Sequence, residues 1–210
     1  MSSMSEPSLE RGQLPMTKRA VQGRATREQL IEIATRLFAT RGYEDTSIEA
    51  VLAAAGVSRG ALYHHFAGKD ALFGAVVESV ENRITAELSA AISDAPDPVA
   101  ALETAALAWI GLAGDPVIQR IILLDAPSVL GMDRWRSMGE HGALAAMRAM
   151  LGEISDSGHL TPGLVDPFAH MILAALDEIA LVIARAEDSG AAMAEGRVAV
   201  RELLRRLLVP

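Results

Sequence analysis

The spacing of the apolar residues limits the fold of this chain more than any other feature. Leu30, Ile33, Ala34, Leu37 and Phe38 recur every three or four positions, and similar spacing continues to the end of the chain. Such a repeat places apolar side chains on one face of a helix, whereas a half-buried strand needs alternation. Because no alternating run of β-branched residues occurs, the sequence predicts an all-α protein.

Glycine and proline divide the chain into about nine expected helices, with Pro127 expected to interrupt one helical stretch. Thr26 with Gln29, and Thr46 with Glu49, have the form of a capping box, and Ser58 has the form of an N-cap. The expected helices cover residues 24–41, 46–55, 58–66, 69–93, 99–113, 115–124, 132–155, 162–186 and 191–208.

Three parts are expected along the chain. Residues 1–23 are rich in Ser, Glu, Pro and Gly, which is typical of a disordered arm, and Met1–Pro15 lacks the apolar stretch of a secretory signal. Residues 24–69 form a small helical domain, and residues 70–210 form a larger helical domain. The chain has no cysteine, so a disulfide framework and a thiolate metal site are excluded, and a cytoplasmic location is expected.

The charge is distributed unevenly between these parts. The net charge is −8, but residues 1–69 hold nine basic and seven acidic residues, whereas residues 70–210 hold ten basic and twenty acidic residues. A positive first part beside an acidic second part favours contact with a polyanion at the first part only.

The segment Thr46–Lys69 has the features of a helix-turn-helix. Ala54 and Ala55 are small enough for two helices to approach closely, and Gly56 suits a sharp turn with positive φ. In this motif the second helix enters the major groove of DNA. Leu62 and Phe66 lie one turn apart on the expected core side, which leaves the polar residues of the second helix exposed.

These polar residues have the chemistry of DNA contacts. Tyr63, His64 and His65 are donors suited to phosphates, and Arg59 near the helix start is suited to a guanine edge. Lys69 adds a cation to the positive end of the next helix. The alternatives are a buried tyrosine, a solvated histidine pair and a plain surface arginine. Zinc binding is not expected, because adjacent histidines point to different faces of a helix.

Residues 30–73 resemble the N-terminal domain of the TetR family of transcriptional regulators. The residues that carry the resemblance are Leu37-Phe38, Gly42-Tyr43, Thr46-Ser47, Ala55 to Ser58, Gly60 to Phe66 and Lys69 to Leu72. One departure is Ala61, where the family often has Thr or Ser, so one hydroxyl contact to the DNA backbone is missing.

The resemblance implies roles for eight residues. Phosphate contacts are implied for Ser47, Tyr63, His65 and Lys69, base contacts for Arg59 with Ser58 and Gly60 beside it, and either role for His64. It also implies a homodimer on a palindromic double-stranded operator, and an all-helical C-terminal domain that binds an effector and dimerises through its last two helices.

A small hydrophobic effector is expected within the C-terminal domain. The side chains considered for its site are Trp109, Asp125, Met132, Trp135, His141 and Asp177. Apolar pockets with few polar groups are the usual form of such sites. The alternative is that the large apolar side chains are core and that the acidic residues serve as caps or ion-pair partners.

The segment Phe168–Ala186 is apolar around most of its circumference. Asp177 and Glu178 in its middle would be costly in lipid, so a helix buried in protein is expected instead of a membrane span. We expect residues 162–186 and 191–208 of two chains to form a four-helix bundle at the centre of the dimer.

The sequence shows no Gly-rich phosphate loop, nucleophile elbow or metal-ligand spacing, so neither enzymatic activity nor a cofactor or metal is expected. The leading interpretation is a DNA-binding repressor that a small hydrophobic effector releases. The alternatives are an effector-independent regulator or activator, a small all-helical enzyme and a helical interaction protein.

Overall fold

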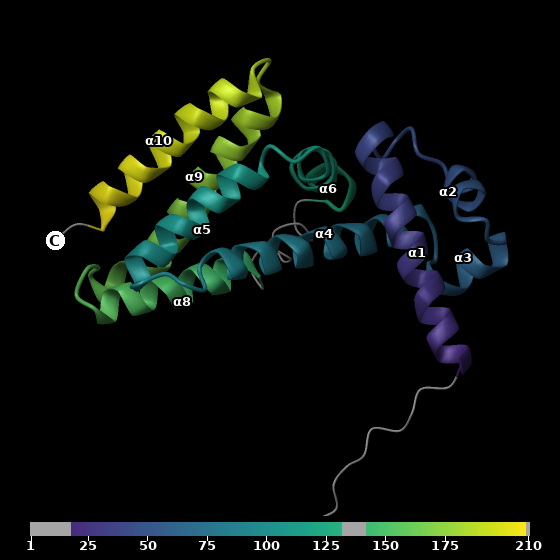
Figure 1. Cartoon of the computed structure of the whole chain (residues 1–210), viewed down its shortest axis with the longest axis horizontal. Coiled ribbons are helices and arrows are strands. Elements are labelled where there is room, and N and C mark those ends of the chain that lie inside the picture. Colours follow the sequence, from purple (N-terminus) through teal and green to yellow (C-terminus); the bar gives the residue numbers. More distant parts are fainter. Residues whose placement is uncertain (1–17, 132–141, 209–210) are drawn as a thin grey trace, which may run out of the picture.

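The computed structural model describes residues 18–131 and 142–208. These residues form nine α-helices, one π-helix and one turn of 3-10 helix, and no strand occurs among them. The predicted all-α fold is therefore confirmed. Figure 1 shows two groups of helices, with α1, α2 and α3 at one end of the long axis and α5, α8, α9 and α10 at the other, linked by α4.

The smaller group consists of α1 (Lys18–Arg41), α2 (Ile48–Ala55) and α3 (Arg59–His65). Leu30, Phe38 and Leu62 are completely buried in its core, together with Phe73 of the next helix. The rings of Phe38 and Phe73 meet edge to face at 5.1 Å. Burying each of these large side chains stabilises the fold by about 1.5–3 kcal/mol, so the core fixes the orientation of α3.

Helix α1 begins at Lys18, which corrects the expected start at Arg24 and the expected disorder of the arm over its last six residues. Thr26 is not an N-cap: its hydroxyl donates to the carbonyl of Gln22, one turn earlier in the same helix. Gln29 does not complete a capping box either, because its amide donates to the carbonyl of Ala55 in α2. The two residues match a capping box in type and spacing, but they lie inside the helix.

The second expected capping box is also wrong in its details. Ser47, not Thr46, is the N-cap of α2, and its hydroxyl accepts from the backbone N–H of Ala50. Thr46 is buried, and its hydroxyl donates to the carbonyl of Gly42 at the end of α1. Thr46 therefore ties the two helices together while its neighbour caps the second.

Helix α4 (Lys69–Ala91) connects the two groups. Its first half buries Leu72, Phe73, Val76 and Val77 against the small domain, and Ile84 is buried further along. It packs against α1 on one side and against α5 on the other. One continuous helix thus belongs to both cores.

The larger group begins with α5 (Pro98–Leu112) and the π-helix η1 (Ile118–Asp125), followed by α6 (Ala126–Val129). It continues with α8 (Ala143–Asp156), η2 (Pro162–Leu164), α9 (Val165–Arg185) and α10 (Ser189–Leu207). Helix α9 packs against α8, α5 and α10, and α10 also packs against α5. The described part of the helix expected over 132–155 begins only at Ala143, and the last helix begins at Ser189, where Asp188 is its N-cap.

Pro127 does not interrupt the helical path, contrary to expectation. The chain stays helical from η1 into α6, and the N–H of Ala126 reaches back five residues to the carbonyl of Ile121. Proline inside an α-helix removes a hydrogen bond and clashes with the preceding turn. Pro127 avoids this conflict because it lies in the first turn of α6, directly after the π-helix, where proline is tolerated.

Candidate DNA-binding interface

The turn between α2 and α3 is fixed by backbone geometry. Gly56 adopts φ 65°, in the left-handed region that favours glycine, and its N–H donates to the carbonyl of Leu52. Two residues later, the hydroxyl of Ser58 accepts from the N–H of Ala61 and caps α3. The expected turn at Gly56 and the cap at Ser58 are both confirmed.

Helix α3 has a clear buried face and a clear exposed face. Leu62 is completely buried, and Phe66, which follows the helix, is nearly so. Arg59, Gly60, Tyr63 and His64 are exposed, and Tyr63 leaves 47% of its surface accessible. A large aromatic side chain exposed between an arginine and a histidine offers donors to a partner outside this chain.

Arg59 forms an ion pair with Glu49 of α2, a contact that the sequence did not suggest. Both side chains are more than half exposed, so the pair contributes less than about 1 kcal/mol. The guanidinium can therefore exchange this partner for a base edge or a phosphate at small cost. Without such a partner, the guanidinium of Arg59 stays paired with Glu49 of α2.

The two histidines differ in their surroundings. His64 is exposed, whereas His65 is half-buried, and their rings lie 5.1 Å apart. Burial lowers the pKa of His65 below its usual value, and the neighbouring His64 and Arg27 lower it further. The lowered pKa favours the neutral imidazole of His65, which can still donate one ring N–H to a phosphate.

Lys69 is held against the turn that precedes α2. Its ammonium lies 4.0 Å from the centre of the Tyr43 ring and donates to the carbonyl of Glu44. The Tyr43 hydroxyl donates in turn to Asp70. This arrangement fixes the position of the lysine charge, although Lys69 is partly covered and not freely extended.

Ser47 and Ser58 each serve as an N-cap, so their oxygens are already engaged with backbone N–H groups. Both residues are exposed, and each hydroxyl can still donate its proton outward. Gly60 is exposed on the first turn of α3, and a side chain there would have only the Ser58 hydroxyl nearby, at 3.9 Å. Seven of the eight predicted DNA-contact residues therefore lie on α3 and its two flanking turns, and Ser47 lies at the start of α2.

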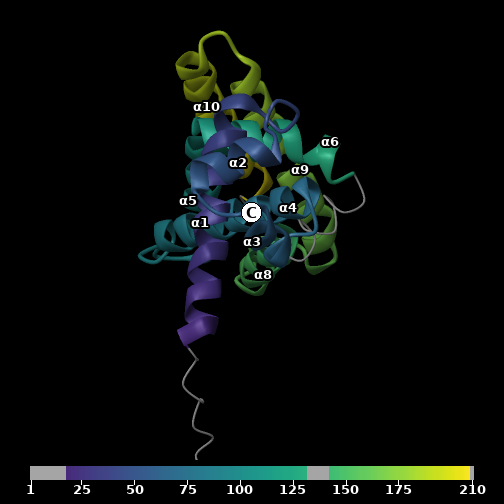
Figure 2. The same cartoon turned by 90° about the vertical axis from the view of Figure 1, so that its right-hand side faces the viewer.

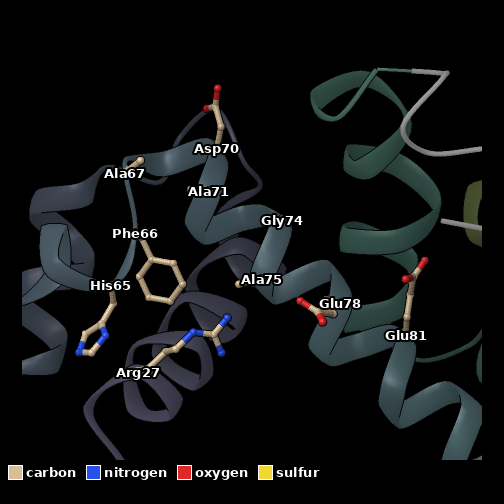
Figure 3. A pocket seen from close by; sticks show the side chains of 10 residues that line it. All are labelled: Arg27, His65, Phe66, Ala67, Asp70, Ala71, Gly74, Ala75, Glu78 and Glu81. Atoms are coloured by element: carbon tan, nitrogen blue, oxygen red, sulfur yellow. The ribbon is translucent and has the colours of Figure 1, made fainter. Parts of the chain in front are cut away.

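A groove of about 690 Å³ separates α3 from the middle of α4, as Figure 3 shows. Arg27 of α1, His65 and Phe66 lie at one end, and Glu78 and Glu81 of α4 lie at the other. The Arg27 guanidinium lies 5.4 Å from the centre of the Phe66 ring. Burial raises the pKa of Glu81, with a further contribution from Glu78. The acidic end of this groove is unsuited to phosphates.

Asp125 links the larger helical group to the small domain, a contact that sequence reasoning missed. Its carboxylate accepts from the backbone N–H of Tyr43 at 2.8 Å and from Arg120 at 3.1 Å. The Arg120 guanidinium also lies directly against Gly42, whose φ of 81° is in the left-handed region that favours glycine. No local sequence pattern predicts the contact between Tyr43 and Asp125, because these two residues are 82 positions apart.

The residues considered for an effector site are not gathered into one site by the described structure. Asp125 is engaged with Tyr43 and Arg120, and Asp177 is exposed on the outer side of α9. The indole N–H of Trp109 in α5 is buried and has no acceptor among the described residues. Met132, Trp135 and His141 lie outside the described residues.

Comparisons with known proteins agree with this geometry. Residues 30–76 match the model of bacterial regulatory proteins of the tetR family, and residues 99–207 match the model of the tetracyclin repressor-like C-terminal domain. A solved TetR-family transcriptional regulator from Pectobacterium atrosepticum is 34% identical. It superposes with a TM-score of 0.78, over 93% of this chain and 99% of the other.

More distant comparisons show the same fold and the same N-terminal domain. The fatty acid degradation regulator FadR from Bacillus halodurans is 20% identical with a TM-score of 0.71, over 87% of this chain and 94% of the other. The transcriptional regulator AcrR of Shigella flexneri is 40% identical over 63 residues, 30% of this chain and 29% of AcrR. A transcriptional repressor of Mycobacterium tuberculosis is 42% identical over 65 residues, 31% of this chain and 35% of the repressor. The chain thus spans about a third of the length of these two curated relatives.

Proposed function

This chain belongs to the TetR family of transcriptional regulators, and from that premise we propose that it is a homodimeric repressor released from its operator by a small hydrophobic effector. The observation that carries the proposal is the exposed face of α3. Arg59, Tyr63 and His64 point outward from a helix that Leu62 anchors in the core and Ser58 caps. This is the arrangement that a helix needs in order to read a major groove.

Dimerisation is supported by the outer faces of α9 and α10. Met171 and Val182 on α9 and Val198 on α10 leave more than half of their surfaces exposed. Pro162–Arg185 is long and apolar enough to cross a membrane, yet Asp177 and Glu178 interrupt it. A second copy of the same two helices would cover the apolar surface without burying these charges in lipid.

An effector site in the C-terminal domain is supported by Trp109. A buried donor without an acceptor costs free energy, about 1–3 kcal/mol. A bound molecule with an apolar body and one acceptor oxygen would satisfy the indole N–H. Helix α4 and the Asp125 contact connect this domain to the small domain that contains α3, so a ligand that favours one arrangement of the two domains would change operator affinity.

Two other functions remain as alternatives. An effector-independent regulator or an activator would use the same interface and differ only in the C-terminal domain. A small all-helical enzyme is disfavoured, because the chain belongs to a family of regulators. As a DNA-binding regulator, the protein is expected in the cytoplasm.

A mobility-shift assay with DNA from beside the protein's own gene tests the proposal. We expect the full chain to shift this fragment in the presence of a large excess of unrelated duplex, with two half-sites protected. Equal affinity for the fragment and for unrelated DNA would overturn the assignment as a sequence-specific regulator. Release of the shifted complex by a hydrophobic compound from a screened panel would support the effector.

A further inference from the structure

Helices α2 and α3 contain one acidic and one basic side chain, and these two form an ion pair. Residues 47–66, from the cap of α2 to the end of α3, include a single glutamate and a single arginine, and no lysine or aspartate. Nη2 of Arg59 lies 2.5 Å from Oε1 of Glu49. Because neutralisation of phosphates supplies most of the sequence-independent affinity for DNA, this pairing removes the main cation of α3 from that attraction.

The pair joins two helices at the surface that faces DNA. The ion pairs of α1 connect residues one turn apart in the same helix, whereas Glu49 and Arg59 are ten positions apart, in the first turn of α2 and at the start of α3. Both helices lie at the outer end of the molecule in Figure 1, and they face the viewer in Figure 2, which looks from that end. The Glu49 carboxylate is thus adjacent to two predicted DNA contacts, Ser47 and Arg59.

The ion pair leaves most donors of the guanidinium available. It engages Nη2, whereas a guanidinium carries five N–H donors in a planar fork. The edge of guanine offers two neutral acceptors, O6 and N7, to such a fork. Arg59 can therefore bind a guanine while Glu49 still accepts from Nη2. A side chain that is already ordered loses less conformational entropy when it makes this contact.

A phosphate is a poorer partner for Arg59 while Glu49 is present. Replacing the carboxylate by a phosphate exchanges one anion for another, and it leaves the charge of Glu49 unpaired close to the DNA backbone. Both side chains of the pair are more than 60% exposed, so water weakens the attraction and the repulsion alike, and the effect on affinity is only several-fold. Glu49 thus reduces the attraction of Arg59 to DNA of any sequence more than its attraction to a guanine.

We propose that Glu49 is a specificity-determining residue, which neutralises the charge of Arg59 toward phosphates and orders its guanidinium for a base edge. The inference rests on the proposed function, in which Arg59 reads a base pair of the operator. Glu49 acts through Arg59 and is therefore a positioning residue. Its effect is expected on the ratio between the affinities for the operator and for unrelated DNA.

Glu49→Gln tests the proposal, because glutamine keeps the length of the side chain and removes its charge. Affinities of the full chain are measured for the operator fragment and for an unrelated duplex of the same length, over a salt series. The variant should bind the unrelated duplex about three- to tenfold more tightly at low salt, with a salt dependence steeper by about one unit per half-site. Its affinity for the operator should rise by less than about twofold, so the ratio of the two affinities falls.

Glu32→Gln is the matched control. Glu32 is 72% exposed and paired with Arg36, and it lines a groove between α1 and α4, away from the contact between α2 and α3. The control removes the same charge and should keep the wild-type ratio of affinities. A second control introduces Glu49→Gln into the Arg59→Ala variant. It should leave the ratio of that variant unchanged, because no guanidinium remains to be released.

The ratio of affinities separates the possible outcomes. A ratio for Glu49→Gln equal to or above the wild-type ratio would overturn the inference, including the case in which both affinities rise by one factor because the carboxylate only repels DNA. A fall in the ratio that persists in the Arg59→Ala background would also overturn it, because Glu49 would then act without Arg59. Equal affinity of the wild-type chain for the two duplexes would instead overturn the proposed function.

Discussion

At the scale of single residues, Tyr43 joins the two parts of the molecule. Its backbone N–H donates to Asp125, its hydroxyl donates to Asp70, and its ring packs against Phe38 and Phe73. Burial raises the pKa of its phenol, and the hydrogen bond and charge of Asp70 raise it further. Tyr43 thus stays a neutral donor at any physiological pH.

Arg59 and Lys69 should respond differently to substitution by alanine. Arg59→Ala should cost about 1–3 kcal/mol on the operator and relax the preference at one base pair in each half-site. Lys69→Ala should weaken binding to all sequences alike and make the salt slope shallower by about one unit per half-site. Affinity titrations on the operator and on single-base variants of it measure both effects.

Arg36→Ala is a matched control for Arg59→Ala. Arg36 is 62% exposed and paired with Glu32, just as Arg59 is 61% exposed and paired with Glu49. The control should leave the base preference unchanged. Wild-type affinity for both Arg59→Ala and Lys69→Ala across the salt series would contradict the proposed interface.

Asp125→Ala should destabilise the fold by about 1–3 kcal/mol, because the N–H of Tyr43 and the Arg120 guanidinium would each lose their acceptor in a partly buried place. Urea unfolding measures the loss. Asp166→Ala removes a carboxylate whose ion pair with Arg148 is exposed, and it should cost less than about 1 kcal/mol. Equal losses in the two variants would show that the Asp125 contact adds nothing.

At the scale of helices, substitutions at two glycines distinguish the effect of side-chain packing from the effect of intrinsic helix propensity. Gly196→Ala should destabilise the α9–α10 contact by about 1–3 kcal/mol, because the new Cβ would lie 2.8 Å from Ile179. Gly152→Ala in α8 meets open space and should stabilise the chain by about 0.5–1 kcal/mol. Urea unfolding at one fixed protein concentration measures the free energy of unfolding of each variant. A change in the same direction for both variants would contradict the close contact between Gly196 and Ile179.

Helix α9 carries a carboxyl with an unusual titration. Partial burial raises the pKa of Asp177 to about 6, although the residue is exposed at the surface of the single chain. A raised carboxyl pKa disfavours the charged form in the folded state. The contribution of Asp177 to the free energy of unfolding is therefore fully present below about pH 4, and it is lost as the pH rises through about 6.

Asp177→Asn should remove this loss. The variant should unfold at the same temperature as wild type near pH 4 and at a higher temperature above pH 6. The difference should amount to at most about 1 kcal/mol, since solvent screens the exposed part of the group. Thermal unfolding curves that stay parallel for the two proteins across this pH range would contradict the assignment.

At the scale of the whole molecule, the exposed apolar side chains of α9 and α10 predict a dimer. Light scattering should give twice the 22.2 kDa of one chain at micromolar concentration. Val182→Glu with Val198→Glu should shift the species toward the monomer, because a closed interface would bury four unpaired carboxylates. Leu124→Glu changes an exposed leucine of η1, outside α9 and α10, and should leave the mass unchanged. A wild-type monomer would contradict the dimer.

The features that depend on short-range pattern could be predicted from the amino-acid sequence. Helical periodicity predicted the all-α fold, Gly56 and Ser58 predicted the turn and cap of the helix-turn-helix, and Leu62 and Phe66 predicted the inner face of α3. Each prediction rests on residues within a turn or two of one another, where backbone sterics and side-chain reach decide the outcome.

The partner that each polar side chain takes depends instead on the folded chain. Thr26 and Gln29 match a capping box in the sequence, but helix α1 continues through them and Gln29 is used by α2. Pro127 lies in the first turn of a helix that directly follows a π-helix, and the Asp125 side chain serves the contact with Tyr43 and not an isolated cap. These outcomes depend on groups brought together from distant parts of the chain. The choice among several possible hydrogen-bond partners does not produce a periodic pattern in the sequence, so it could not be predicted from the sequence.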